Sequence, residues 1–514
     1  MIVLILKKIF KKRWVLLCLG DVFLIINSCF GYSLLETDNF ILSSAFYLRN
    51  DLVTFKNVVD LDNRNKDDSV TYFGIDYNLS YCLEFKKNGP KFYLKLERNG
   101  PYDYDAPLFI HNTLMTQGGV IEKYHGTQLL PQIEEFWLDM PLADFFRSKI
   151  GLYTYEVGNG FSLNGGFENF GFTLYKEWEN SVFRIYYCRP DLVYKNPLGP
   201  RIRQEKEQEI QYDSGASNFF SADAKFNLGK HCLHPYIGAL IDYTSEGKRN
   251  NSFSAPIKRD ILGTAGLAYK IDQDNFSWTL EMAHNFGQAK SSDSDYEDIL
   301  HTGYLIFTDL TYPLGKFVPS FQFLLCSGNK VTKEMVQNRD EKLTSSKNRA
   351  FSYYSPLNTN LSDSISSSNV DARPIVAMGT GYGLNYGILR PTIFSASDFD
   401  NLVMYCLGFD LELTEKLSLG FYGYLLRSFA KGAGMYNDQA KYLSKDLGKE
   451  ADLFIDYRLN KNILISFLGG CFFPGRYHKE KRSDIEGSLF SPFLRGDGDA
   501  DPAYQLELAV EFNF

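Results

Sequence analysis

The sequence predicts an all-β protein: a single antiparallel transmembrane β-barrel of about 18 strands, with short periplasmic turns and long external loops. Three observations point to this fold: a secretory leader, apolar–polar alternation along many short segments, and connections that alternate in length. Alternation places apolar and polar side chains on opposite faces of a strand. A membrane barrel needs this pattern because only every second residue meets lipid.

The first 31 residues have the features of a secretory signal peptide. Five basic residues, ending at Arg13, precede an apolar stretch from Trp14 to Ile26, and Cys29-Phe30-Gly31 offers a cleavage site with small flanking residues. We therefore expect a signal peptide over 1–31 and one barrel domain over 32–514. After the leader no apolar run reaches about 18 residues, so no transmembrane helix is expected in the mature chain.

The net charge excludes nucleic acid as a partner. The whole chain carries −8, and the leader contributes five positive charges and Asp21, a sum of +4. The mature chain is therefore near −12 (−8 − 4). Nucleic-acid binding would require a basic face instead.

The clearest strands lie near the N-terminus. In VTYFGIDYNLSYCLEF (70–85), Phe73, Tyr77 and Phe85 share one face, and Asp76 and Glu84 lie on the other. The segment KFYLKLER (91–98) follows after KNGP, which contains an Asn-Gly pair. This arrangement predicts a hairpin.

Short and long connections alternate along the rest of the chain. Short ones lie at 86–90, 141–145, 178–180, 229–234, 271–275, 313–316, 414–416 and 460–462. Long polar ones lie at 50–69, 99–131, 156–169, 190–218, 245–259, 287–298, 327–399, 428–448 and 474–502. One strand on each side of every connection predicts 18 strands: 40–49, 70–85, 91–98, 132–140, 146–155, 170–178, 181–189, 219–229, 234–244, 260–271, 276–286, 300–312, 317–326, 400–413, 417–427, 449–459, 463–473 and 503–514. This even count puts both termini at the end with the short turns, as in bacterial single-chain barrels.

The segment 327–399 admits two interpretations. It could contain two more strands, with GTGYGLNYGIL (379–389) as the candidate, and the count would stay even. It could instead be a functional lid or plug, because structureless connections of this length are uncommon.

The final strand, PAYQLELAVEFNF, alternates strictly and ends on Phe514. It resembles the closing strand of bacterial outer-membrane barrels, which the assembly machinery usually reads. We therefore expect two partners, outer-membrane lipid and the barrel-assembly machinery, the latter through the strand ending at Phe514. The alternative is the edge strand of a soluble sheet that ends on an aromatic residue by chance.

Alternation also predicts which charges face the lumen. The expected inward bases are Lys91, Lys95, Lys149, Arg184, Lys225, Lys270 and Arg458. The expected inward acids are Asp76, Glu84, Glu97, Glu135, Asp139, Asp223, Asp242, Glu281, Asp410, Glu412, Asp452, Asp456, Glu507 and Glu511. Acids outnumber bases about two to one, which predicts a lumen that is acidic on average and favours cations.

A smaller set of residues is expected to line the path of a solute. It comprises Lys95, Glu135, Asp139, Lys149, Glu156, Asn159, Arg184, Asp410, Asp452, Asp456, Arg458 and Glu507. Its members on the last strands would form a charged ladder at a constriction, or cross-strand ion pairs that stiffen the wall. The segment EVGNGFSLNGG (156–166) would fold inward as a constriction loop, or form a flexible surface turn that uses its glycines.

Cysteine and histidine patterns indicate no metal site and no catalytic centre. The six cysteines after the leader are widely spaced without a CxxC pair, so we expect small packed side chains, although an oxidising compartment would allow pairing. His231 and His234 bracket a turn without a wider ligand pattern, and no GxSxG motif occurs. We expect no enzymatic activity.

Two stretches resemble the alginate-export family of eighteen-stranded outer-membrane barrels. They are SKIGLYTYEVGNGFSLNGGFENF (148–170) and LGKEADLFIDYRLNKNILISFLGGCFFPG (447–475), and SGNK (327–330) resembles the start of a loop in that family. The resemblance implies a passive conduit for a polysaccharide or small solutes, without a cofactor. The family's founding member has a basic lumen suited to an acidic polysaccharide. The acidic lumen expected here departs from it and argues against alginate.

Two functions of different classes follow. The first is an outer-membrane channel, a porin or exporter, for passive passage of small solutes or a polysaccharide. The second is a closed-barrel adhesin or structural protein that acts through its external loops. The two differ in whether 156–169 and 327–399 occupy the lumen. A third possibility, an outer-membrane enzyme, would require acid and base residues clustered at one rim.

Overall fold

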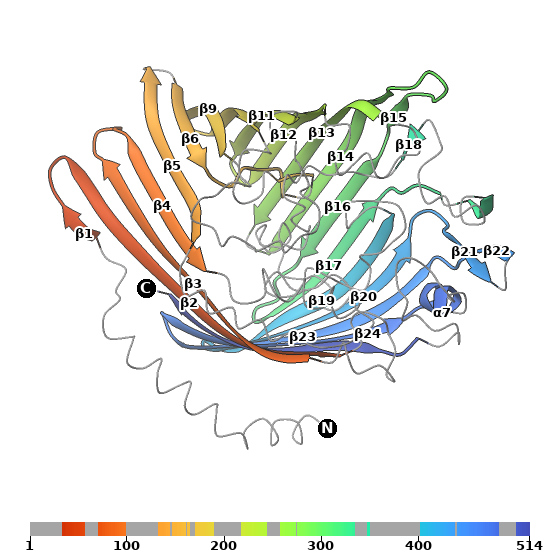
Figure 1. Ribbon diagram of the computed structural model, residues 1–514. Coiled ribbons are helices and arrows are strands. Elements are labelled where there is room, and N and C mark those ends of the chain that lie inside the picture. Colours follow the sequence, from red (N-terminus) through yellow and green to blue (C-terminus); the bar gives the residue numbers. More distant parts are fainter. Residues whose placement is uncertain are drawn as a thin grey trace, which may run out of the picture.

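Eighteen strands close into one antiparallel barrel in the computed structural model of the chain (Figure 1). The structure describes residues 33–56, 70–98, 132–143, 146–160, 162–164, 170–189, 217–243, 257–273, 275–330, 332–334, 347–349, 401–436, 439–482 and 500–513. The barrel strands are β2 (Phe40–Lys56), β3 (Val70–Phe85), β4 (Lys91–Arg98), β5 (Gln132–Ala143), β6 (Phe146–Leu152), β9 (Phe170–Trp178), β10 (Ser181–Cys188), β11 (Ser217–Leu228), β12 (His231–Asp242), β13 (Ile257–Gln273), β14 (Phe276–Ser291), β16 (Tyr304–Thr311), β17 (Phe317–Cys326), β19 (Leu402–Thr414), β20 (Leu417–Ser428), β23 (Asp446–Asn460), β24 (Ile463–Pro474) and β25 (Ala503–Asn513). They match the 18 predicted strands one for one.

The barrel closes where its first and last strands meet. β2 pairs with β25 from Tyr47↔Asn513 to Lys56↔Tyr504, and its other edge pairs with β3. Every remaining neighbour in the ring is also antiparallel, as hairpin-connected strands require. Closure removes the free edges that an open sheet would expose.

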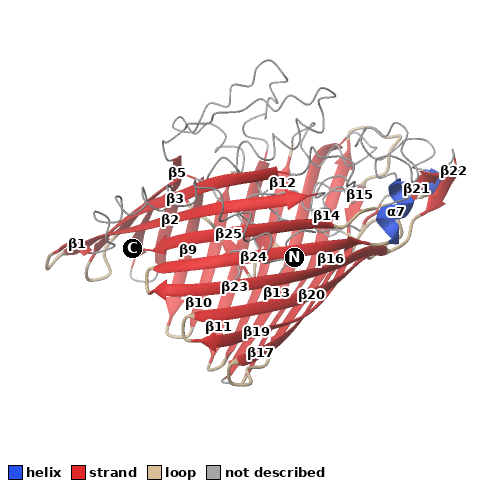
Figure 2. Ribbon diagram, turned by 90° about the horizontal axis from the view of Figure 1, so that it is seen from below, coloured by secondary structure: helices blue, strands red, loops and turns tan. Residues whose placement is uncertain are grey.

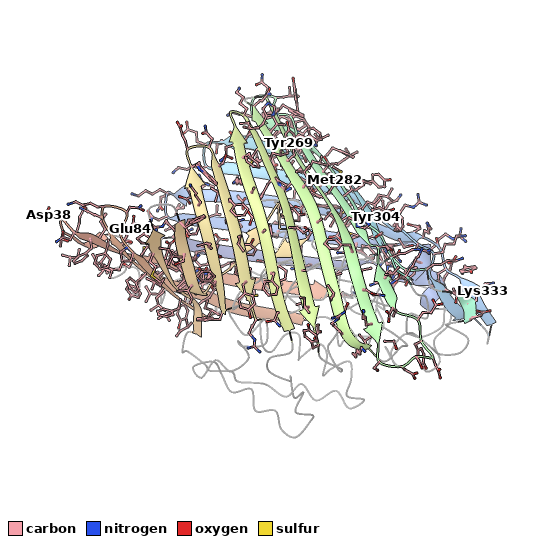
Figure 3. All side chains as sticks on the ribbon, turned by 90° about the horizontal axis from the view of Figure 1, so that it is seen from above. Asp38, Glu84, Tyr269, Met282, Tyr304 and Lys333 are labelled. Carbon is pink, nitrogen blue, oxygen red and sulfur yellow. The ribbon has the colours of Figure 1, made fainter. Side chains whose placement is uncertain are left out.

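The outer face of the strands is apolar. Tyr269, Met282 and Tyr304 project outward from β13, β14 and β16 (Figure 3). Large apolar side chains are exposed around the ring, among them Phe136 (56%), Ile237 (50%) and Leu407 (69%). The residues that alternate with them face inward and are mostly buried. The two-residue period of the sequence therefore separates lipid-facing side chains from inward-facing ones.

The short turns gather at one end of the barrel (Figure 2). The turn between β3 and β4 has positive φ at Lys87 (59°) and Asn88 (61°), the geometry of a type I′ hairpin. The hairpin prediction is confirmed, with the turn centred one residue before the Asn-Gly pair. Glu84 lies at this end, whereas Lys333 lies at the opposite end (Figure 3).

Several boundaries differ from the prediction. β2 continues to Lys56, although the strand was predicted to end at 49 and a long polar connection to begin at 50. The predicted strand 300–312 is interrupted, because β15 (Ile299–His301) pairs with β14 before β16 takes over that edge. β15 also pairs in parallel with β18 (Lys347–Asn348). The leader, the segment 379–389 and Phe514 lie outside the described residues.

Several smaller elements are not part of the ring of 18 strands. β1 (Ser33–Glu36) folds back along β2, with Ser33↔Ser43 and Glu36↔Ile41 as partners. Two short hairpins, β7 (Glu156–Val157) with β8 (Leu163–Asn164) and β21 (Ala433–Tyr436) with β22 (Gln439–Tyr442), and the helix α7 (Arg476–Arg482) complete the structure. No helix among the described residues is long and apolar enough to cross a membrane.

The six cysteines after the leader are all described, and all are free thiols. Cys188, Cys326 and Cys406 are buried, and the other three are half-buried. They lie on six different strands, and none forms a disulfide bond in the structure.

Candidate functional site

The inner face of the barrel has two arcs of different charge. We call the inner faces of β4 to β11 the mixed wall and those of β19 to β25 with β2 the acidic wall. In the strand order these arcs lie on opposite sides of the ring (Figure 1). Described side chains of the mixed wall comprise six bases and five acids: Lys91, Lys95, Arg147, Lys149, Arg184 and Lys225 with Glu97, Glu135, Asp139, Glu177 and Asp223. Those of the acidic wall comprise seven acids and two bases: Asp410, Glu412, Glu450, Asp452, Asp456, Glu507 and Glu511 with Arg49 and Arg458.

Most bases of the mixed wall have a carboxylate partner. The Lys95 amine lies 2.6 Å from Glu97, and the Arg147 guanidinium lies 2.9 Å from Asp139. Arg184 pairs with Asp223 at 2.9 Å. Lys95 and Glu97 are two residues apart on β4, whereas the other two pairs join neighbouring strands. This arc is therefore polar but has little net charge.

Lys149 is held differently from the other bases of this wall. Its amine lies 4.0 Å from the centre of the Trp137 ring and 4.2 Å from that of Tyr153. Both rings are within the range of a cation–π contact. Two aromatic faces therefore position this ammonium group on the inner wall, with Glu135 and Asp139 on the adjoining strand.

The segment 153–164, described except for residue 161, lies against the inner face of the mixed wall. Tyr153, Tyr155 and Val157 are buried in one cluster with wall residues that include Tyr186 and Phe219. The Tyr155 and Tyr186 rings stack 3.9 Å apart at 9°. Alternate residues after β6 thus face the wall, and burial of their apolar surface fastens the segment there.

Polar contacts fasten the same segment further along. The Gly158 amide donates to Nδ1 of His234 at 3.2 Å, and the Asn159 amide donates to Glu281 at 2.6 Å. The Ser162 hydroxyl donates to the second oxygen of Glu281 at 2.9 Å. Arg184 donates to the backbone carbonyl of Glu156 at 2.9 Å. These contacts hold the described residues of 156–166 against the inner wall, and their role as a constriction remains a prediction.

Gly158 is required at the tightest point of this segment. Its φ is +66°, a left-handed conformation that favours glycine. A Cβ there would also lie 2.9 Å from the Tyr236 ring and 3.0 Å from the Glu281 carboxylate. Glycine therefore serves both the turn and the close approach of the backbone to the wall.

Asp223 is the centre of a buried hydrogen-bond network. It accepts from Arg184, from Nε2 of His234 at 2.8 Å and from the Tyr155 hydroxyl at 2.7 Å. Burial, and secondarily the Asp223 charge, raises the pKa of the Tyr155 phenol well above its usual value, so the phenol remains a donor. Both ring nitrogens of His234 are therefore engaged, Nδ1 with the Gly158 amide and Nε2 with Asp223. His231 lies on the opposite face of β12, bonded to Tyr269.

The acidic wall is joined across the barrel seam by one arginine. Arg49 on β2 contacts Glu507 and lies 2.6 Å from Glu511, both on β25. Glu507 is 1% exposed. On β19, Asp410 accepts a hydrogen bond of 2.6 Å from Tyr422. The sequence pattern placed Glu507 and Glu511 on the inner face but missed Arg49, because β2 was expected to end at that residue.

The predicted path residues fall into two groups. Lys95, Glu135, Asp139, Lys149 and Arg184 lie on the mixed wall, and Glu156 and Asn159 lie in the segment fastened to it. Asp410, Asp452, Asp456, Arg458 and Glu507 lie on the acidic wall. The structure therefore does not gather all twelve at one point. Arg49, Arg147, Tyr155 and His234 were missed, although the parity of their positions would have placed each on an inner face or against one.

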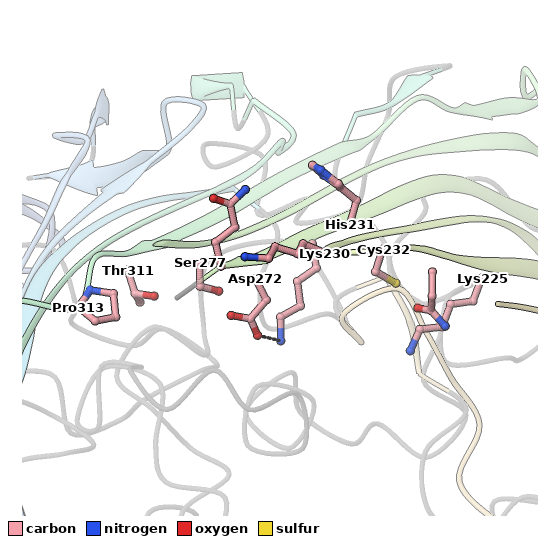
Figure 4. Close-up of a pocket in the computed structure, with 12 residues that line it drawn as sticks. Lys225, Lys230, His231, Cys232, Asp272, Ser277, Thr311 and Pro313 are labelled. Carbon is pink, nitrogen blue, oxygen red and sulfur yellow. Dashed lines mark ion pairs between the residues drawn. The ribbon is translucent and has the colours of Figure 1, made fainter. Parts of the chain in front are cut away.

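A hollow of about 860 Å³ opens beside the turns that join β11 to β12 and β13 to β14 (Figure 4). Lys225, Lys230, Lys270 and Asp272 are among its lining residues. Lys270 lies 3.8 Å from Asp272, and both side chains are exposed. This part of the short-turn end is therefore basic, in contrast to the acidic wall.

Comparison with known proteins gives structural matches only. No protein-family model matches the chain, and no curated protein matches it. Among solved structures it is similar to OccAB3 of Acinetobacter baumannii (9% identity, 92% of this chain and 99% of that one, TM-score 0.48). It is also similar to OprD of Pseudomonas aeruginosa (10% identity, 95% and 97%, TM-score 0.46) and to a BenF-like porin of Pseudomonas fluorescens Pf-5 (10% identity, 92% and 98%, TM-score 0.47).

Removal of Arg49 tests the seam. In Arg49→Met the buried Glu507 loses its cationic partner, which should reduce the free energy of unfolding by about 3–5 kcal/mol. The measurement is urea-induced unfolding of the barrel in lipid vesicles. The double variant Arg49→Met/Glu507→Gln should recover most of the loss, because Glu507 is then neutral and only the more exposed Glu511 (17% exposed) loses its cationic partner.

The matched control for this seam variant is Lys91→Met. Lys91 lies 3.4 Å from Glu84 in a much more exposed pair (38% and 55% exposed), whose loss should cost about 0–1 kcal/mol. Equal losses for Arg49→Met and Lys91→Met would contradict the importance of the buried seam contact.

Proposed function

We propose that the chain is a passive channel of the bacterial outer membrane that conducts small solutes through a polar, cation-favouring lumen. The observation that carries this proposal is the division of the closed barrel into an apolar outside and a charged inside. An apolar belt suits the hydrocarbon core of a bilayer, and closure leaves no backbone edge to meet lipid. If the interior were a dry core, burial of so many charged side chains would carry a large desolvation cost. A charged inner face therefore favours a water-filled lumen.

The arrangement of charges suggests which solutes pass. The acidic wall carries five more acids than bases (seven less two), and the mixed wall one more base than acids (six less five). Rings and rows of carboxylates favour cations in a pore. We infer that a cation follows the acidic wall, while the segment 153–164 narrows the path from the opposite side. Asp410, Asp456 and Lys149 are the residues expected to have the largest effect on selectivity.

The finer predictions remain proposals. Passage of a polysaccharide and membership of the alginate-export family rest on the quoted sequence stretches. Recognition of the last strand by the assembly machinery rests on its alternation and its terminal Phe514. The adhesin hypothesis depends on the external connections, and most of 327–399 lies outside the described residues. No contact among the described residues favours it over a channel.

Membrane insertion is tested on the outer face. Leu407 lies in the middle of β19 and is 69% exposed, and Leu413 lies near the strand end. Leu407→Lys should reduce the folding free energy in lipid vesicles by about 2–4 kcal/mol, because it places a charge at the bilayer midplane. Leu413→Lys, the control, should cost only about 0–1 kcal/mol. Equal effects at the two positions would argue against a bilayer around this strand.

Ion selectivity is tested by the reversal potential across a planar bilayer under a potassium chloride gradient. We expect a cation-selective reversal potential for the purified barrel. Asp410→Asn/Asp456→Asn should lower the cation-to-anion permeability ratio roughly twofold, because it removes two carboxylates from the acidic wall. Lys149→Met should change it in the opposite direction. Anion selectivity of the unmodified barrel would contradict the proposed role of the acidic wall.

A further inference from the structure

The hydrogen bonds of His234 define its protonation state. The partner of its Nδ1 is the backbone N–H of Gly158, which can only donate, so Nδ1 must be the unprotonated acceptor. Nε2 then carries the proton and donates it to Asp223 at 2.8 Å. With the segment docked, the imidazole is therefore neutral and exists as a single tautomer.

A second proton on the ring is incompatible with the docked segment. Protonation of Nδ1 would leave two N–H groups, from Gly158 and His234, facing each other across 3.2 Å. The segment must move away from the ring before Nδ1 can take up a proton from solvent. Because only the undocked form binds this proton, acid favours undocking.

The surroundings do not prevent this protonation. The titratable and charged groups facing the ring come from β10, β11, β14, its own strand β12 and the segment: Arg184, Asp223, Glu281, Tyr236 and Tyr155. On β13 the residue opposite is Ala268, which does not titrate. The two carboxylates of Asp223 and Glu281 therefore face one guanidinium, and a positive imidazolium brings this cluster closer to neutrality.

We propose that His234 is a proton-sensitive latch that holds the segment 153–164 against the inner wall at neutral pH and releases it in acid. This inference rests on the proposed channel function, because the latch would regulate the width of that channel. The contacts of Asn159 and Ser162 with Glu281 are not removed by protonation of His234. The release therefore begins at Gly158 and shifts an equilibrium, by at most about tenfold per pH unit for one proton.

A second histidine has the same bonding pattern and provides a matched control. Nε2 of His301 lies 2.7 Å from Asp260, and Nδ1 lies 3.4 Å from the amide nitrogen of Asn348. The orientation of that amide follows from Asn329, which accepts from the Arg349 N–H and donates to the Asn348 oxygen. His301 is thus also a neutral acceptor, but it binds β18 rather than the segment 153–164.

Two substitutions separate the two halves of the His234 latch. In His234→Asn the side-chain oxygen can replace Nδ1 as the acceptor for Gly158 but cannot be protonated. In His234→Gln the amide nitrogen can replace Nε2 as the donor to Asp223, while the acceptor for Gly158 is lost. His301→Asn applies the same change at the matched pair.

The experiment measures single-channel conductance of the barrel in planar bilayers between about pH 8 and about pH 5, where histidine normally titrates. The unmodified barrel and His301→Asn should conduct more as the pH falls. His234→Asn should stay at the low level throughout, and His234→Gln at the high level. A pH response that survives in His234→Asn, or that only His301→Asn abolishes, would overturn the latch, as would constant conductance of the unmodified barrel.

Amide hydrogen exchange of 153–164 tests the latch without any channel activity. After correction for the intrinsic effect of pH, exchange in the unmodified barrel should be slow at neutral pH and faster in acid, and His234→Asn should remove this change. If no protein conducts at any pH, the channel function fails and exchange alone decides on the latch. Exchange that is equally fast at both pH values in the unmodified barrel would reject it.

Discussion

Pairing of the first strand with the last is the constraint on which the rest of the structure depends. β2 and β25 are separated by almost the whole chain, and their ten residue pairs turn an open sheet into a ring. Once the ring is closed, each strand has two partners, and the two faces become an outside and an inside. Arg49 adds a side-chain contact at this seam, bridging to two carboxylates of β25. The inward position of every charge discussed above is a consequence of this closure.

The lumen combines two kinds of construction. Its walls are built from strands, whose alternation sets the position of each side chain with little freedom. The segment 153–164 is instead attached to the wall by a few specific contacts, aromatic packing at Tyr155 and hydrogen bonds at Gly158 and Asn159. A wall of this kind holds its side chains in fixed positions, whereas an attached segment responds to whatever alters its few contacts.

Much of the fold could be predicted because a barrel repeats one rule. Alternation and the order of short and long connections were enough to find the 18 barrel strands, and parity was enough to place Lys149 and Asp452 on an inner face. The partners of those residues depend on register and on contacts between distant strands, which local patterns do not contain. Arg49 was missed for that reason, because its two carboxylate partners lie on β25, near the other end of the sequence. The sequence shows His234 only as half of a histidine pair without a metal-ligand pattern. Its contact with Gly158 joins positions 76 residues apart, which no local pattern indicates.

The short strand β1 has a consequence for how the chain can be matured. β25 covers β2 only from Tyr47 onward, and β1 covers the same edge at Ile41 to Ser43. A chain trimmed beyond Glu36 would expose backbone donors and acceptors there, in a position to join the sheet of a neighbouring molecule. A protease that removes the leader must therefore cut upstream of Ser33 to keep this seal. The position of the cut would then determine whether this edge of β2 is covered or is free to pair with a strand of another molecule.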